Sequence, residues 1–235
     1  MFIKKFIFMT LCAITFSTSA FAADEHAGAI YHAFRLETGV GSTNDGVGIS
    51  NWHFDGWIGT DENKVWLKSE GKRENGVSHR AEFWTMYSRN IGTFWDAQIG
   101  VRHDTKPYSL TYGVIGFSGL APYFFETKAH LFVSGDGDVS ARIRQENEFL
   151  ITQKLITQPY IEANLFLQDV PKLGMGAGLS SAEVGVQTRY EFTREFAMYF
   201  DVKYERKFGK TSSIVKNQGE DNDATAFTVG VKWMF

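Results

Sequence analysis

The sequence contains little of what builds a disulfide-linked or thiolate-binding protein. Its 235 residues include one cysteine, Cys12, and four prolines. Cys12 lies in an N-terminal stretch that we expect to be removed, so the mature protein has no disulfide and no thiolate ligand, although it passes through an oxidising compartment. The scarcity of proline, together with 23 glycines and 15% aromatic residues, favours many strands joined by tight turns.

Long hydrophobic runs are also missing. After residue 22, no stretch is long and apolar enough for a membrane-spanning helix, which excludes a helical inner-membrane protein. The mean hydropathy of -0.21 would suit a soluble protein. A β-barrel gives the same average, because its lipid-facing and lumen-facing residues alternate. The net charge of -3 implies no special affinity for nucleic acid.

The N-terminal segment is typical of a secretory signal peptide. It has two lysines near its start, an apolar stretch over residues 6–16, and small and polar residues up to residue 22. The apolar stretch is too short to cross a bilayer as an anchor, which takes about 20 residues. We therefore expect residues 1–22 to be cleaved and residues 23–235 to form a single outer-membrane β-barrel domain.

The C-terminal segment alternates apolar and polar residues up to a terminal aromatic residue. The residues predicted to face lipid are Phe227, Val229, Val231, Trp233 and Phe235, and those predicted to face inward are Thr228, Gly230 and Lys232. The spacing of Thr228, Gly230, Trp233 and Phe235 resembles the signal that the bacterial barrel-assembly machinery reads. An ordinary soluble edge strand is the alternative for this segment taken alone.

The same alternation recurs along the chain and predicts about twelve strands, an even number as bacterial barrels require. The predicted spans are 29–39, 50–60, 64–74, 77–89, 94–104, 109–119, 123–134, 139–151, 155–168, 180–192, 196–207 and 225–235. The predicted fold is therefore all-β, a transmembrane up-and-down antiparallel β-barrel in the outer membrane of a diderm bacterium. With both termini in the periplasm, the periplasmic turns are short, and the longer connections 41–46, 169–178 and 208–223 lie outside the cell.

The predicted interior is rich in charge. The charged residues with inward parity are Lys68, Glu70, Glu82, Asp96, Arg102, Glu126, Lys128, Arg142, Arg144, Glu146, Glu148, Glu162, Arg189, Glu191, Asp201, Lys203 and Glu205. Opposite charges this dense either pair across the lumen and fill it, or line a narrow wet channel. The rule that charges away from water must be paired favours the salt-bridged filling, and a selective polar path is the alternative.

A series of short motifs resembles the outer-membrane copper resistance protein B family (CopB/PcoB). The matching segments, in order, are 66–71, 87–89, 94–96, 100–104, 119–123, 136–142, 158–159, 162–164, 194–197 and 205–209. The resemblance implies a barrel that acts in copper tolerance, with copper as ligand or transported ion and no organic cofactor. The expected partners are outer-membrane lipid, the barrel-assembly machinery and periplasmic copper-binding proteins, and the barrel is expected to be a monomer.

One departure from that family concerns the segment between signal peptide and barrel. Family members commonly carry a Met- and His-rich stretch there, and thioether and imidazole groups suit copper. Residues 23–30 contain one histidine and no methionine. If copper is bound, the barrel or its loops must supply the ligands.

Four histidines on four different strands are candidate copper ligands. His53, His79, His103 and His130 are each predicted to lie toward the extracellular end of a strand, and His53 and His130 have inward parity. We hypothesise a loose metal-capturing cluster at the outer mouth, with Met175 in a long external loop as a soft ligand. The alternative is that these are interfacial or rim histidines, because no pair has the close spacing of a compact metal site.

Motifs of other functions fail on inspection. Residues 209–211 resemble the end of a phosphate loop, but Tyr204 stands where the first glycine belongs and no helix is predicted to follow. No serine, histidine and aspartate constellation is recognisable, so no catalytic residue is predicted. The alternatives to a copper protein are a small channel for another solute and, third, a barrel-embedded hydrolase.

Overall fold

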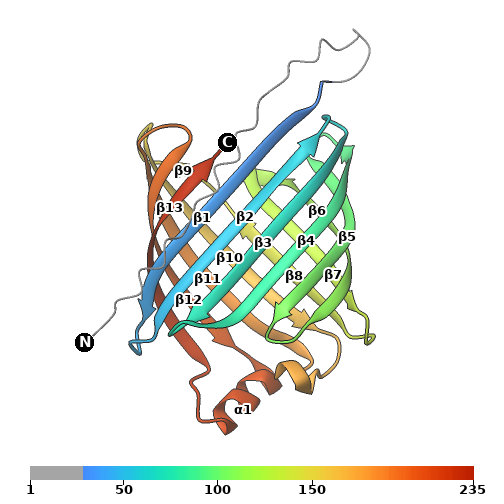
Figure 1. Ribbon diagram of the computed structural model, residues 1–235, viewed down its shortest axis with the longest axis vertical. Helices are drawn as coiled ribbons and strands as arrows, with labels where there is room; N and C mark the ends of the chain where they lie inside the picture. The colour runs from blue at the N-terminus through green and yellow to red at the C-terminus, as the bar shows by residue number, and fades with distance from the viewer. Residues whose placement is uncertain (1–28) are drawn as a thin grey trace, which may run out of the picture.

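The computed structural model describes residues 29–235, so the expected signal peptide lies outside the described residues. One antiparallel sheet closes on itself into a barrel (Figure 1). Its strands are β1 (Tyr31–Thr43), β2 (Gly48–Gly59), β3 (Asn63–Glu74), β4 (Val77–Gly92), β5 (Trp95–Lys106), β6 (Leu110–Ala121), β7 (Phe125–Ser134), β8 (Val139–Glu146), β9 (Phe149–Leu150), β10 (Leu155–Phe166), β11 (Gly178–Glu191), β12 (Phe196–Lys207) and β13 (Asp223–Met234).

Pairing between the first and last strands removes the sheet edges. β1 pairs with β13 from Arg35 opposite Met234 to Thr43 opposite Ala226. The short β9 and the longer β8 both pair with β10, so together they form one interrupted strand of the barrel. The barrel therefore has twelve strands, and the predicted up-and-down β-barrel is confirmed. Closure leaves no row of unpaired backbone groups, which hydrocarbon cannot satisfy.

The two faces of each strand differ as the alternation predicts. On β13, Val229 and Trp233 are 53% and 52% exposed, whereas Thr228 and Lys232 are each 2% exposed. Large apolar side chains are exposed in this way on strands all round the barrel. The outward face is thus the surface that contacts lipid, and the polar face is turned into the lumen.

The two ends of the barrel differ in their connections (Figure 1). β1 begins and β13 finishes at the same end of the barrel, here called the terminal end, where the turns between strands are short. The opposite end, here called the α1 end, carries the helix α1 (Gly209–Asn217) and the 3-10 helix η2 (Pro171–Leu173). A further 3-10 turn, η1 (Pro122–Phe124), lies at the terminal end.

Two predictions about the α1 end were wrong. Residues 41–46 form no long loop, because β1 continues to Thr43 and a tight turn returns the chain, with the Thr43 N–H donating to the Val47 carbonyl at 2.9 Å. A helix does follow the phosphate-loop-like segment, since α1 begins at Gly209. No helix within residues 29–235 is long and apolar enough to cross a membrane.

Aromatic rings lie directly over two glycines, Gly71 on the outer face of the barrel and Gly185 on its inner face. A Cβ atom on Gly71 would lie 2.1 Å from the Trp52 ring, and one on Gly185 would lie 2.4 Å from the Tyr160 ring. Each ring comes from a strand that neighbours the glycine's own strand, since Trp52 pairs with Gly71 and Tyr160 with Gly185. Only glycine permits this close approach, so these positions fix the large aromatic rings against the barrel wall.

Candidate functional site

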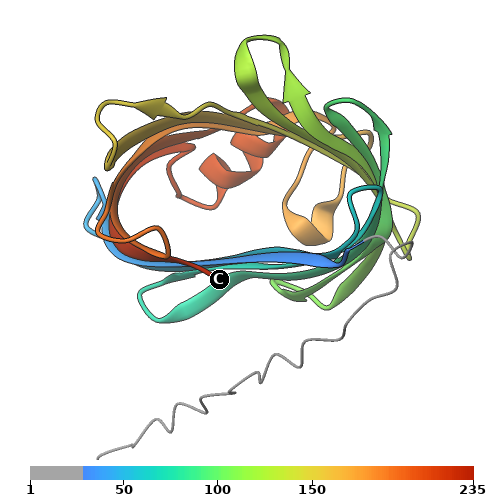
Figure 2. The same cartoon turned by 90° about the horizontal axis from the view of Figure 1, so that it is seen from above.

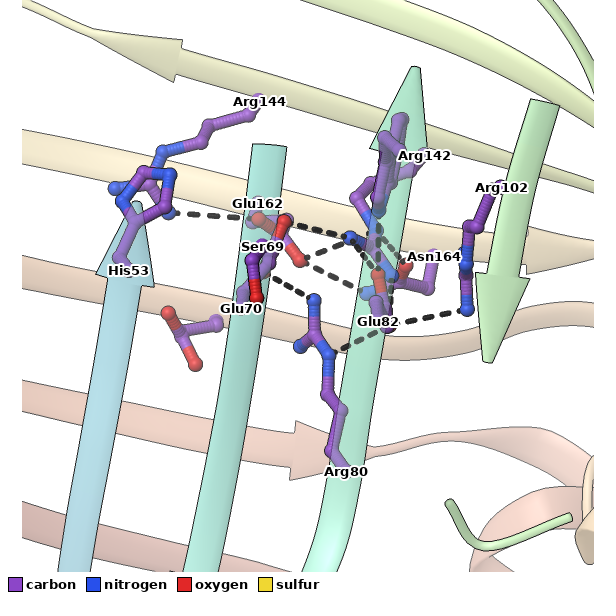
Figure 3. A network of polar contacts seen from close by, with 12 residues as sticks. His53, Ser69, Glu70, Arg80, Glu82, Arg102, Arg142, Arg144, Glu162 and Asn164 are labelled. Carbon is purple, nitrogen blue, oxygen red and sulfur yellow. Dashed lines mark hydrogen bonds and ion pairs between the residues drawn. The ribbon is translucent and has the colours of Figure 1, made fainter. Parts of the chain in front are cut away.

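A bridge of charged side chains crosses the lumen (Figure 3). Arg142 on β8 donates two hydrogen bonds to Glu82 on β4, at 3.2 Å and 3.1 Å, and its Nη1 lies 3.5 Å from Glu70 Oε1 on β3. Strands β5, β6 and β7 separate β4 from β8 along the barrel wall. These contacts therefore join the two walls through the interior rather than along the sheet.

Two more arginines complete the bridge at Glu82. Arg80 Nε lies 2.6 Å from Glu82 Oε1, and Arg102 Nη2 lies 3.0 Å from the same oxygen. Arg80 also reaches Glu70 Oε2 at 2.6 Å. Glu82 is 2% exposed. A buried carboxylate is tolerated only where cations and hydrogen bonds compensate its lost hydration, and three guanidinium groups do so here.

Apolar side chains fill the lumen on one side of the bridge. The cluster consists of Trp84, Met86, Tyr112, Val114 and Phe132, which come from β4, β6 and β7. Trp84 and Phe132 meet edge to face, with ring centroids 5.1 Å apart. Arg102 lies over this cluster, 4.9 Å from the centroids of both Tyr112 and Phe132. The cluster packs as a protein core does, so this part of the interior is apolar.

A polar cavity of about 200 Å³ occupies the other side of the bridge. Seven carboxylates and seven Lys or Arg side chains line it, namely Glu37, Asp55, Glu70, Glu146, Glu162, Glu183 and Asp201 with Lys68, Lys72, Arg80, Lys128, Arg142, Arg144 and Lys203. Lys203 pairs with Glu183 at 2.8 Å, and Tyr160 donates from its hydroxyl to Asp201 at 3.2 Å. The cavity wall is therefore strongly charged but locally neutral.

Most of the residues predicted to line the lumen take part in ion pairs on the inner face, whereas Lys68 has no ion-pair partner within residues 29–235. Arg144 pairs with Glu146 at 2.9 Å and with Glu162 at 3.4 Å. Nearer the terminal end, Lys128 contacts Glu126 at 2.7 Å. Further pairs on this face include Lys64 with Asp96 at 2.9 Å and Arg189 with Glu148 at 2.8 Å. The interior thus contains a packed apolar cluster and, beside it, a polar cavity lined by paired charges.

Two of the four candidate histidines lie on the wall of the cavity. His53 Nε2 is 3.8 Å from Asp55 Oδ1. His130 is 6% exposed, its Nε2 lies 2.8 Å from Gln98 Oε1, and its ring meets Trp84 edge to face. Both histidines lie near the middle of their strands rather than at the outer mouth, which corrects the predicted position.

The other predicted ligands lie elsewhere. His103 is on the outer face, since it alternates with the inward Arg102 and Asp104, and its Nδ1 lies 2.9 Å from Thr111 Oγ1. His79 is also on the outer face, with 54% of its side chain exposed. The structure therefore does not bring the four histidines together. Among residues 29–235, no group of three or more His, Cys, Asp or Glu side chains has the arrangement of a metal site.

Met175 belongs to a latch at the α1 end, which consists of the loop between β10 and β11 together with α1. The Ser180 hydroxyl donates to Met175 Sδ at 3.0 Å and lies 3.0 Å from Thr211 Oγ1. The Gly176 N–H donates to Thr211 Oγ1 at 2.9 Å. Viewed along the barrel, α1 and the η2 loop lie within the outline of the ring (Figure 2). The loop is thus fastened to α1 across the end of the barrel.

An ion pair on the surface of this latch joins Asp169 to Lys210. The Lys210 ammonium and the Ala177 N–H both donate to the Asp169 carboxylate and hold its pKa below the ordinary value. The sequence reasoning missed α1 and the latch. Thr211 and Val215, the two buried residues of α1, have the i, i+4 spacing of a helix. A helix of nine residues is too short for this single pair to distinguish it from a loop by sequence alone.

Comparison with known proteins identifies the family. The model of the family described as "Copper resistance protein B precursor (CopB)" matches residues 31–235. The chain belongs to the copper resistance protein B family. It is 38% identical over 211 residues to copper resistance protein B of Escherichia coli, covering 89% of this chain and 71% of that protein. The family resemblance inferred from the motifs is confirmed.

A second relative is the copper resistance protein B homolog of Pseudomonas syringae pv. tomato. It is 35% identical over 193 residues, and the match covers 82% of this chain and 65% of that protein. The chain therefore spans about two thirds of the length of these CopB relatives.

Solved structures agree on the fold. The KdgM porin has a TM-score of 0.56 at 11% identity and covers 86% of this chain and 99% of its own. The NanC porin has a TM-score of 0.58 at 12% identity, with coverage of 85% and 98%. At this identity the likeness concerns the fold alone. Together with the family, it places this CopB protein in the outer membrane and links it to copper resistance.

Proposed function

We propose that the protein serves copper resistance by binding copper ions in the polar cavity and mediating their passage across the outer membrane. One observation carries the proposal. In a lumen that is otherwise packed with apolar or salt-bridged side chains, His53 and His130 face the same polar cavity. Imidazole nitrogen is a good ligand for copper, and the two histidines reach the cavity from two strands that are not neighbours, β2 and β7.

The donor set favours transit over storage. The carboxylates near His53 are already engaged, since Asp55 accepts from Arg35 at 2.8 Å and Glu70 pairs with Arg80. Two histidines without a third ligand give weak and exchangeable contacts. Conduction requires such contacts, because an ion that enters a pore must also leave it. Copper is therefore the cargo in this proposal and not a resident cofactor.

The test compares two double variants of the full-length protein. Replacing His53 and His130 with Ala removes the cavity imidazoles, whereas replacing His79 and His103 with Ala removes two imidazoles from the outer face. Copper accumulation in cells and copper-dependent conductance in planar bilayers should change for the first variant and stay at wild-type values for the second. Equal copper binding and conductance in the wild type and the His53/His130 variant would eliminate the cavity as the copper path.

A small channel for another solute is the second candidate function. The likeness to two proteins described as porins supports it. Conductance measured with and without copper separates the two, because a general channel conducts equally well in both. The barrel fold and the family favour a non-enzymatic role in either case.

We also propose the partners. The apolar outer face contacts outer-membrane lipid, and Thr228, Gly230, Trp233 and Phe235 form the segment read by the barrel-assembly machinery. Periplasmic copper-binding proteins exchange copper at the terminal end, and the barrel works as a monomer. Truncating Trp233 to Phe235 and measuring the amount of barrel in the outer membrane tests the assembly signal.

A further inference from the structure

Lys68 differs from the other cations of the cavity wall. Within residues 29–235, no carboxylate oxygen lies within 4.0 Å of its ammonium group, and no hydrogen-bond partner is found for it. Lys64 offers the contrast. It lies on the same face of the same strand, and its Nζ is 2.9 Å from Asp96 Oδ2.

The reason is that the nearest carboxylates are taken. Asp55 stands directly opposite Lys68 on β2 but accepts from Arg35. Glu70, the next inward residue of β3, is held by Arg80. On the other side, Lys68 is opposite Trp84 of β4. The ammonium group lies 5.7 Å from the Trp84 ring and 5.6 Å from the Trp66 ring. Aromatic faces attract a cation, but they do not replace a hydrogen-bond acceptor for its three N–H groups.

A second donor beside Lys68 lacks an acceptor. The indole Nε1 of Trp66 is buried and has no hydrogen-bond partner. Trp66 precedes Lys68 by two residues on β3, so both side chains point to the inner face. Buried donors are normally paired, and leaving one unpaired costs about 1–3 kcal/mol. The ammonium group of Lys68 and the indole N–H of Trp66 can only donate hydrogen bonds. A ligand that satisfies both must therefore accept hydrogen bonds, as an anion does.

We infer that Lys68, which lines the cavity, forms a subsite for a small anion such as a halide or a carboxylate, with the indole N–H of Trp66 on the same face of β3 as a second donor. Trp66 itself packs against the apolar cluster beside the cavity. The subsite sits at the edge of the cavity nearer the terminal end, on the same wall as the bridge residue Glu70. If copper passes through this cavity, as proposed above, the subsite means that copper crosses together with an anionic ligand rather than as a bare cation. This consequence rests on the proposed function, whereas the subsite itself does not. The balance of charge around the cavity fits such a neutral complex better than a free divalent ion.

Iodide is a suitable probe, because it binds as an anion and quenches indole fluorescence. We expect the full-length barrel in detergent to show saturable quenching by iodide, competed by chloride and by acetate. Lys68→Met should weaken iodide binding about tenfold, the size expected for the loss of one charge-assisted hydrogen bond. Trp66→Phe should weaken iodide binding, because it removes the indole N–H, and Lys68→Arg should retain binding. Trp84, whose ring lies 5.7 Å from the Lys68 ammonium, remains to report the quenching.

Lys64→Met is the matched control. It removes the same charge from the same face of β3 beside another tryptophan, Trp57, but from a lysine that already has a carboxylate partner. In planar bilayers under a potassium chloride gradient, Lys68→Met should shift the reversal potential toward cation selectivity more than Lys64→Met does. Gel mobility with and without heating confirms that each variant is folded.

Two results would overturn the inference. One is unchanged saturable quenching in folded Lys68→Met protein. The other is an equal shift of reversal potential in the Lys64 and Lys68 variants, which would reduce the effect to net charge. If Lys68→Met does not fold, the Lys68→Arg and Trp66→Phe proteins still decide the matter through iodide quenching. These measurements contain no copper, so they stand or fall separately from the copper path.

Discussion

Glu82 is the carboxylate whose loss should affect the barrel interior most. Three arginines contact it, Arg80 at 2.6 Å, Arg102 at 3.0 Å and Arg142 at 3.1 Å, and its side chain is 3% exposed. Glu82→Gln keeps the shape and removes the charge, which leaves three guanidinium groups around a neutral amide. Removing one partner of a buried ion pair costs about 3–5 kcal/mol, because the remaining charge stays buried without compensation.

We therefore expect Glu82→Gln to lower the free energy of unfolding by about 3–5 kcal/mol. The measurement is urea unfolding of the barrel in lipid vesicles, followed by tryptophan fluorescence and by gel mobility. Glu126→Gln is the control. Its side chain is 44% exposed and its ion pair is with Lys128 alone, so its loss should cost about 1 kcal/mol or less. Equal losses for the two variants would refute the view that the bridge stabilises the barrel.

Three further predictions concern other parts of the barrel. Gly71→Val should lower stability by about 1–3 kcal/mol, because its side chain would collide with the Trp52 ring, and Trp52→Ala in the same chain should recover part of the loss in the urea assay. Gly176→Cys with Lys210→Cys should form a disulfide on oxidation, seen as a gel shift that reductant reverses. A Cβ on Gly176 would lie 2.5 Å from Lys210 Cβ, so the loop must move outward by about 1 Å to reach the roughly 3.5–4.5 Å between the Cβ atoms of a disulfide. The described residues contain no other cysteine that could compete. The pKa of Asp169 is lowered, so its ion pair with Lys210 is fully formed above the ordinary Asp pKa of about 4 and is lost as the pH falls below that value. Limited proteolysis of the β10–β11 loop should therefore become faster in acid. Asp169→Asn should abolish that pH dependence.

The barrel could be predicted from the sequence because its determinants are local. A two-residue period assigns each side chain to a face, and short turns with residues such as Asn75 and Gly76, both at positive φ, set the strand ends. The inward parity of charged residues follows from the same period. The outward faces of His79 and His103 could also have been read in this way, since each stands between residues of inward parity.

The division of the lumen could not be predicted. It depends on Arg142 meeting Glu82, which lies 60 positions away and on a strand that is not a neighbour. Neither the alternation nor the turns specify which residues meet across a barrel of unknown cross-section. The helix α1 could not be predicted for a related reason. Its N-cap, Phe208, makes no side-chain cap, so the helix relies on tertiary contacts at Thr211 and Val215 that no local pattern reveals.

The bridge and the latch are separate structures at different heights of the barrel, so the proposed passage of copper can be tested at each of them in turn. The bridge joins β3, β4 and β8 inside the barrel, whereas the latch joins the β10–β11 loop to α1 at the α1 end. No residue belongs to both. If the width of the lumen limits conductance, Glu82→Gln should raise it whether the cysteine pair of the latch is oxidised or reduced. If the α1 end limits conductance, reduction of that pair should raise it in the wild-type and in the Glu82→Gln background alike. The change that raises conductance therefore identifies which of the two structures limits the proposed passage.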